Sequence, residues 1–285
     1  MNHPIGYALA AMVCYGLSDF IYKQGAAVRI RADHFLMAQA WFFCPLVILY
    51  ALATRTLVIE SAAVWGSVAG AFIFIGFYYF IRSLTAGAVS TNASIFRMNF
   101  IVTVVLVVAL LGEPLTPGKI IGLALALLAT WLLVGAAADA DRTSNEARRR
   151  SLVQVGIATL AFGASNFFHT LGLRHGALPE TLAVAQAILF MPLATVVVYL
   201  TDGKLQAPPV TFKYGAAAAI VLLGATIFLL RGVAEGQASV LVPTAQMGFI
   251  IAALLGISFL REPVTIRKAI GLAAALIALA VLATS

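Results

Sequence analysis

Charged residues are scarce in this sequence. Only 10% of the 285 residues are Asp, Glu, Lys or Arg, whereas 62% are hydrophobic, and the mean hydropathy is +1.01. A soluble domain has about 25% charged residues, so this chain lacks the charge needed to cover a surface that faces water. Disordered chains combine many charges with few apolar residues, and this composition is the reverse. The sequence therefore indicates a protein embedded in lipid.

Groups that could carry chemistry are scarce as well. The two cysteines lie within apolar runs, the four histidines form no HExxH motif, and no DDxxD run or nucleotide-binding loop is present. A membrane-embedded enzyme needs a metal-binding cluster or an activated nucleophile. We therefore expect no catalytic residues, no metal and no cofactor, and we exclude ATP as a direct energy source.

Long apolar runs are what the sequence has in abundance. A spanning helix needs about 20 mostly apolar residues, whereas barrel strands have about 9–11 residues of alternating polarity, a pattern absent here. The predicted spans are residues 5–24, 34–54, 62–82, 89–111, 118–138, 152–173, 180–201, 213–233, 239–260 and 267–284. The expected fold class is an all-α integral membrane protein with ten transmembrane helices.

The two halves of the sequence match each other. Ser18-Asp19-Phe20 corresponds to Ser165-Asn166-Phe167, 147 residues later, and Glu113-Pro114 corresponds to Glu262-Pro263, 149 residues later. The further matches are Gln39 with Gln186, Arg82 with Arg231, Ser90 with Ser239, Lys119 with Lys268, and Gly122 with Gly271. We infer two five-helix repeats, residues 1–138 and 152–285, joined by a cytoplasmic linker over residues 139–151.

Because each repeat has an odd number of spans, the two repeats run in opposite directions through the membrane. The basic residues set the orientation, since cytoplasmic loops are rich in Lys and Arg. With both termini in the periplasm, the only basic residues outside are Arg55, Lys119, Arg174 and Arg231. Inverted repeats enclose a midplane site that opens alternately to each side, so the architecture favours a transporter, although fold alone does not determine function.

Paired corner motifs carry a family resemblance. Gly112-Glu113-Pro114-Leu115 precedes Lys119 and Gly122, and Arg261-Glu262-Pro263-Val264 precedes the equivalent Lys and Gly. With ten helices in two repeats, the chain resembles the drug/metabolite transporter superfamily, specifically its EamA-type exporters, and within these the YddG-type bacterial amino acid exporters. The resemblance implies efflux of amino acids or small metabolites across the inner membrane. We expect membrane lipid around a monomer and no nucleic acid partner. Both glutamates are expected to be structural, at helix N-termini.

Two charged residues lie inside predicted spans. Arg97 lies about 12 Å into the fourth span at 1.5 Å per residue, and Asp19 lies at a similar depth in the first. An arginine at that depth must face a cavity or a partner. Two interpretations stay open: Arg97 binds a substrate carboxylate while Asp19 holds an ammonium group or a proton, or the two form a structural ion pair. The second repeat has Asn166 and Gln246 at these positions.

Further candidates lie beside these charges. Asn92 and Asn99 share one face of the fourth span, and either could line a cavity or bond to a neighbouring helix. Tyr78 or Tyr79 could form a cavity wall, or both could lie at the lipid interface. His169 forms a second polar cluster with Ser165 and Asn166, as a proton carrier or a hydrogen-bonded core group. The nearest rival function is a multidrug exporter of organic cations, which the acidic Asp19 permits and Arg97 disfavours.

Overall fold

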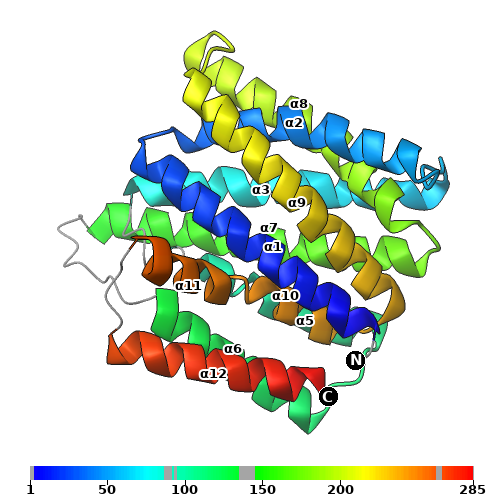
Figure 1. The fold of residues 1–285 in the computed structure, drawn as a ribbon. Helices are drawn as coiled ribbons and strands as arrows, with labels where there is room; N and C mark the ends of the chain where they lie inside the picture. The colour runs from blue at the N-terminus through cyan, green and yellow to red at the C-terminus, as the bar shows by residue number, and fades with distance from the viewer. Residues whose placement is uncertain (1–2, 87–91, 93–94, 135–144, 261–264, 285) are drawn as a thin grey trace.

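The computed structural model describes residues 3–86, 92, 95–134, 145–260 and 265–284, and these residues form helices and no strands (Figure 1). The helices are α1 (His3–Ala27), α2 (Ala32–Ala53), the short 3₁₀ helix η1 (Ser61–Ala63), α3 (Val64–Ala86), α5 (Asn99–Leu111), α6 (Pro117–Val134), α7 (Asn145–Arg174), α8 (Pro179–Asp202), α9 (Pro209–Glu235), α10 (Ala238–Gln246), α11 (Phe249–Leu260) and α12 (Ile266–Ala283).

Eight spans in the described part of the chain are long and apolar enough to cross a membrane. Two further apolar segments, Ile95–Leu111 and Pro117–Leu133, are shorter than a full span and coincide with the fourth and fifth predicted spans. Helix α7 begins at Asn145, inside the predicted linker, because Glu146 and the arginines that follow favour a helix start and a helical conformation. Linker residues 139–144 lie outside the described residues.

The most extensive helix contacts occur in matching pairs. In chain order, helices α1, α2, α3, α5 and α6 of the first half match α7, α8, α9, α10–α11 and α12 of the second half. With this matching, the contact of α3 with α7 corresponds to the contact of α9 with α1. The contact of α3 with α8 corresponds in the same way to that of α9 with α2, and α6 packs against its own counterpart α12. In Figure 1, α2 and α8 lie at one edge of the bundle and α6 and α12 at the other, with both termini at one end.

Two of these contacts bring backbones together at glycine. A Cβ atom on Gly16 of α1 would lie 2.4 Å from the Gly248 carbonyl oxygen, and one on Gly163 of α7 would lie 2.6 Å from the Asn99 carbonyl oxygen. Small residues permit this close approach of membrane helices. Gly16 and Gly163 are 147 residues apart and Asn99 and Gly248 are 149 apart, so the same contact occurs in both halves of the chain.

The ninth predicted span, 239–260, is not one continuous helix. It breaks at Met247 and Gly248, between α10 and α11, and the fourth span breaks at Met98, 149 residues earlier. Met98 and Met247 have ψ angles of 2° and 13°, far from the helical value near −42°. Hydropathy cannot reveal such a break; it lies where Gly248, a weak helix former, meets the backbone of α1.

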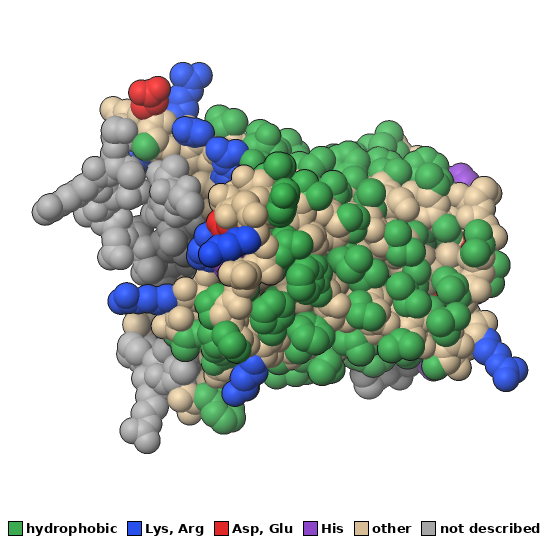
Figure 2. Space-filling view, turned by 90° about the horizontal axis from the view of Figure 1, so that it is seen from above, with side chains coloured by type: hydrophobic (Ala, Val, Ile, Leu, Met, Phe, Trp, Pro, Cys, Tyr) green, Lys and Arg blue, Asp and Glu red, His purple; other side chains and the backbone are tan. Residues whose placement is uncertain are grey.

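The two ends of the bundle differ in charge. Lys and Arg side chains gather at one end, here called the basic end, where α1 ends and α7 begins, while hydrophobic side chains cover the middle of the visible surface (Figure 2). At the basic end, Arg31 contacts Asp33 and lies 2.9 Å from Asp202, and these carboxylates raise the pKa of Arg31. At the opposite end, Arg231 lies 2.6 Å from Glu180 and Arg174 lies 3.1 Å from Glu113.

A polar cavity at the centre of the bundle

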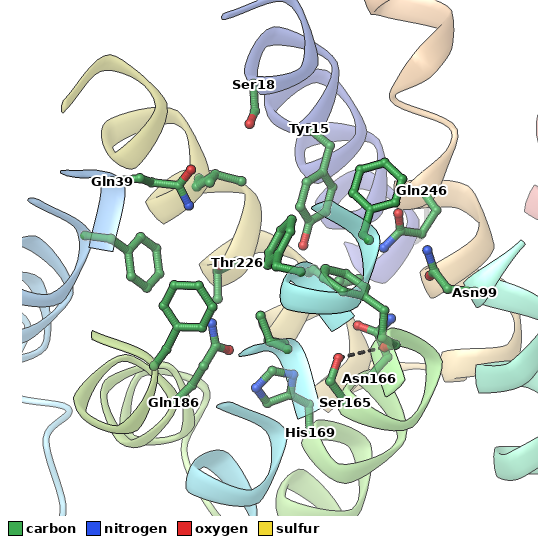
Figure 3. A pocket seen from close by; sticks show the side chains of 18 of the residues that line it. Tyr15, Ser18, Gln39, Asn99, Ser165, Asn166, His169, Gln186, Thr226 and Gln246 are labelled. Atoms are coloured by element: carbon green, nitrogen blue, oxygen red, sulfur yellow. Dashed lines mark hydrogen bonds between the residues drawn. The ribbon is translucent and has the colours of Figure 1, made fainter. Parts of the chain in front are cut away.

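A cavity of about 210 Å³ lies at the centre of the bundle. Its lining residues come from the middle turns of the long helices: Gln39 and Phe43 lie near the midpoint of α2, and Gln186 and Phe190 lie in the middle of α8. Figure 3 shows polar side chains from α1, α2, α7, α8, α9 and α10 pointing toward this space. The cavity therefore lies about halfway along the length of the helices.

Aromatic side chains form much of the apolar wall. The Phe80 and Phe96 rings stack with centroids 4.2 Å apart, and Phe77 and Phe162 meet edge to face at 5.2 Å. The other aromatic lining residues are Tyr15, Tyr22, Phe43 and Phe190. Apolar walls with a few well-placed polar groups are typical of small-molecule sites.

The two charged candidates form an ion pair in this cavity. Arg97 Nη2 lies 2.5 Å from Asp19 Oδ1, and their side chains are 23% and 18% exposed. The second carboxylate oxygen of Asp19, Oδ2, is buried and has no hydrogen-bond partner among the described residues. The pair thus neutralises itself, while one carboxylate oxygen has no hydrogen-bond donor among the described residues.

Unpartnered polar atoms concentrate at the cavity. The buried side-chain atoms that lack a hydrogen bond within the described part of the chain belong to Ser18, Asp19, Asn99, Gln154, Asn166, His169, Gln186 and Thr211, and all except Gln154 and Thr211 belong to lining residues. Leaving a buried polar group unpaired costs about 1–3 kcal/mol. Water or a polar solute in the cavity would satisfy these groups.

Six of the nine predicted site residues line the cavity, namely Asp19, Arg97, Asn99, Asn166, His169 and Gln246. Asn92 does not: its side-chain amide donates to the Ser83 carbonyl and the Ser151 hydroxyl, both at 2.8 Å, so it links helices instead. Tyr78 and Tyr79 also lie outside the lining, and the Tyr78 hydroxyl accepts a 2.7 Å hydrogen bond from Arg82.

Their neighbours Phe77 and Phe80 line the cavity, because residues three apart share a face of α3 while Tyr78 and Tyr79 point away from it. The spacing of Ile73, Phe77 and Phe80 contains this signal, but several faces of the helix are equally apolar. Gln39 and Gln186 occupy matching positions of the two halves. Each lines the cavity, and Gln39 accepts a 2.5 Å hydrogen bond from Tyr22.

The lining is built from matching positions of the two halves. Residues separated by 147 or 149 positions line it together: Tyr15 with Phe162, Ser18 with Ser165, Asp19 with Asn166, Tyr22 with His169, Gln39 with Gln186, Ala40 with Ala187, Phe43 with Phe190, Ile73 with Leu222, Phe77 with Thr226, Phe80 with Leu229, and Arg97 with Gln246. The helix breaks at Met98 and Met247 come directly after the last of these pairs. The first half supplies the charges, and the second supplies neutral polar groups.

The Glu113 carboxylate lies at a helix N-terminus, but the helix is α10 and not α6, which follows Glu113 in the chain. Its carboxylate accepts hydrogen bonds from the backbone N–H groups of Ala238 and Ser239, at 3.1 and 2.9 Å, and so caps α10 from across the bundle. Lys119 is fully buried beside it and donates to Ser239 Oγ at 2.9 Å. The corresponding Glu262 and Pro263 lie outside the described residues.

Comparison with known proteins places part of the chain in a family. Residues 3–135 match the EamA-like transporter family, which consists of transporters and not of enzymes. A solved structure described as "Crystal structure of protein" has a TM-score of 0.80 and 15% sequence identity, over 98% of this chain and 95% of that one, and this likeness shows the fold alone. No curated protein sequence matches the chain. Residues 3–135 of this multi-pass membrane protein thus form an EamA-like transporter domain of the drug/metabolite transporter superfamily.

Proposed function

We propose that the protein is a secondary transporter that exports neutral amino acids, aromatic ones included, or related small metabolites by alternating access. The observation that carries the proposal is a central cavity lined by matching positions of the two halves of the chain. Sites at the interface of inverted repeats, beside helix breaks, are the common plan of secondary transporters. The proposed architecture has ten spans in two inverted repeats, residues 1–138 and 152–285, with the segments at 95–111 and 117–133 counted as spans.

The matched packing supports the inverted repeats beyond residue 135. A Cβ on Gly122 of α6 would lie 2.7 Å from Leu282, and one on Gly271 of α12 would lie 2.8 Å from Leu133. Both partners of the first contact lie 149 residues from those of the second. A two-fold relation between α6 and α12 would produce such a reciprocal contact.

Differences between the two ends support alternating access. At the end opposite the basic end, Glu180 of α8 pairs with Arg231 of α9. The matching positions at the basic end are Asp33 and Arg82, which instead contact Arg31 and Tyr78. If the two halves exchange conformations during transport, Asp33 and Arg82 approach each other in the opposite state while Glu180 and Arg231 separate.

The lining groups favour a small zwitterion. An amino acid can exchange the Asp19–Arg97 pair for two new ones, with its ammonium group on Asp19 and its carboxylate on Arg97. The cavity of about 210 Å³ is smaller than the ≈300–1,000 Å³ typical of sites for drug-sized ligands. The aromatic wall and Asp19 also suit an organic cation, so a multidrug exporter is the second candidate.

The charge distribution supports an orientation in the bacterial inner membrane. Lys and Arg gather at the basic end (Figure 2), and positive charge favours the cytoplasmic side. We therefore place the basic end in the cytoplasm and both termini in the periplasm, with the protein as a monomer in lipid.

An efflux screen tests the proposal. Cells that overproduce the protein would be loaded with each of the twenty amino acids and with a set of cationic dyes, and release would be compared with cells that carry an empty vector. Faster release of neutral amino acids is expected. Release of dyes without any amino acid would support the multidrug alternative and overturn the assignment.

A further inference from the structure

A second group of polar side chains lies in the cavity apart from the ion pair. Asn166 and His169 are three residues apart on α7 and therefore share one face of that helix. Gln186 of α8 lies beside them, and Figure 3 shows the three at one side of the cavity, with Gln39 across from them. We call Asn166, His169 and Gln186 the amide–imidazole cluster.

The cluster is buried, and one polar atom of each member has no hydrogen bond among the described residues. Asn166 and His169 are 7% and 6% exposed. Asn166 Nδ2, His169 Nε2 and Gln186 Oε1 each lack a hydrogen bond within the described part of the chain. The amide nitrogen of Asn166 donates hydrogen bonds and the amide oxygen of Gln186 accepts them, so the cluster offers both kinds of partner.

The matching residues of the first half are paired. Asp19, which matches Asn166, binds Arg97 at 2.5 Å, and Tyr22, which matches His169, donates to Gln39 at 2.5 Å. Gln39 itself matches Gln186. The His169 and Gln186 side chains also interact with each other, as Tyr22 and Gln39 do. The clearest difference is that Asp19 is paired with Arg97, whereas the amide nitrogen of Asn166 has no hydrogen bond in the described part of the chain.

The chemistry of the cluster defines its ligand. Asn166 and Gln186 carry no charge, so they cannot neutralise an ammonium or a carboxylate as Asp19 and Arg97 can. A neutral group that both donates and accepts, such as a hydroxyl or a carboxamide, matches the open atoms. An apolar group there would leave them buried and unpaired.

We infer that the amide–imidazole cluster is a subsite for the substrate side chain, and that the transporter selects amino acids whose side chains carry a hydroxyl or carboxamide. The inference rests on the proposed function, in which Asp19 and Arg97 hold the amino and carboxylate groups. The cluster would bind the side chain of the amino acid, on the other side of the cavity from Asp19 and Arg97.

The test compares substrates of equal shape. The purified protein would be placed in liposomes of bacterial phospholipid, and its transport of radiolabelled threonine would be measured with unlabelled threonine or valine as the competitor. A second series would compare asparagine with leucine as competitors. We expect the polar member of each pair to compete about tenfold better, since an unpaired buried group costs roughly that factor in affinity.

Matched variants locate the effect. Gln186→Leu and Asn166→Leu should each reduce the preference for threonine over valine to below threefold. Gln154→Leu, which removes a buried amide of α7 outside the cavity lining, should keep the preference. Size-exclusion profiles would establish that each variant remains folded in detergent.

The outcomes separate the two proposals. Equal competition by threonine and valine in the parent protein, with both transported, would overturn the subsite and leave amino acid export standing. Loss of preference in Gln154→Leu but not in Gln186→Leu would also overturn it. Failure of every amino acid to compete or be transported would overturn the proposed function and the subsite together.

Discussion

Arg97 and Asp19 meet in the central cavity with their charged atoms 2.5 Å apart, although they come from different predicted spans. The second half of the chain has Gln246 and Asn166 at the matching positions, and these residues also line the cavity. The same framework therefore accommodates a charged pair and a neutral one. Because the framework does not require the charges, their presence in one half points to a role in binding.

The paired variant Asp19→Asn/Arg97→Gln copies the residues of the second half. It should fold, since it leaves no buried charge unpaired, but it should lose efflux of neutral amino acids by at least about a hundredfold. Arg97→Gln alone should also lower stability, because it leaves the partly buried Asp19 carboxylate unpaired. The cost of about 3–5 kcal/mol for breaking a fully buried ion pair is the upper bound. Efflux and thermal unfolding in detergent measure the two effects. Parental efflux by the double variant would remove both residues from the binding site.

The contact between α7 and α5 at Gly163 should not accommodate a side chain at that position. Gly163→Ala places a Cβ about 2.4 Å from Val102 Cβ and 2.6 Å from the Asn99 carbonyl oxygen, and such overpacking costs about 1–3 kcal/mol. Gly156→Ala on the same helix is the matched control: its Cβ meets nothing within 4 Å, and alanine favours the helix. Thermal unfolding should therefore shift down in the first variant and not in the second. Equal melting temperatures would contradict the close contact.

The exchange of end contacts can be followed by cross-linking. In a background with Cys14 and Cys44 replaced by alanine, Glu180→Cys/Arg231→Cys and Asp33→Cys/Arg82→Cys would each be treated with a bifunctional thiol reagent. Each pair should cross-link, and each cross-link should stop transport by holding one state. Substrate should change the two cross-linking rates in opposite directions. Free transport with the Asp33–Arg82 pair cross-linked would exclude this contact from the cycle.

Removal of the Glu113 cap should loosen the end opposite the basic end. Glu113→Gln keeps the shape but withdraws the charge that faces the N-terminus of α10 and Arg174. We expect a loss of about 1–2 kcal/mol in stability, the scale of a lost cap, together with altered transport. Glu235→Gln, at the exposed C-terminal end of α9 and at the same end of the bundle, serves as the control. An unchanged melting temperature in Glu113→Gln would show that the charge contributes nothing to the cap.

The orientation is open to a direct measurement. Two fusions after Ser285 would be compared, one to a reporter that is active only in the periplasm and one to a reporter that is active only in the cytoplasm. Only the periplasmic reporter should give a signal. Cytoplasmic activity would reverse the orientation and, with it, the direction of transport inferred from the basic end.

Part of the site was readable in the sequence because buried charge is rare in lipid. Arg97 and Asp19 stand out within apolar runs, and Asn166 and Gln246 follow from them through the internal repeat. Phe77 could not be preferred over Tyr78 in the same way, since the rotation of an all-apolar helix leaves no mark in its composition. Asn92 has the same character as Asn99, and only the position of Ser151 determines that it joins two helices.

The sequence by itself determined that the chain lies in lipid, where the apolar runs fall, and that residues of its two halves match at offsets of 147 and 149 positions. These are local properties, since a backbone in lipid must satisfy its own hydrogen bonds and does so as a helix. Only the tertiary structure decided where helices break, as at Met98 and Met247, and which helix receives the Glu113 cap. Those features depend on backbones and charges brought together from distant parts of the chain, which no run of neighbouring residues specifies.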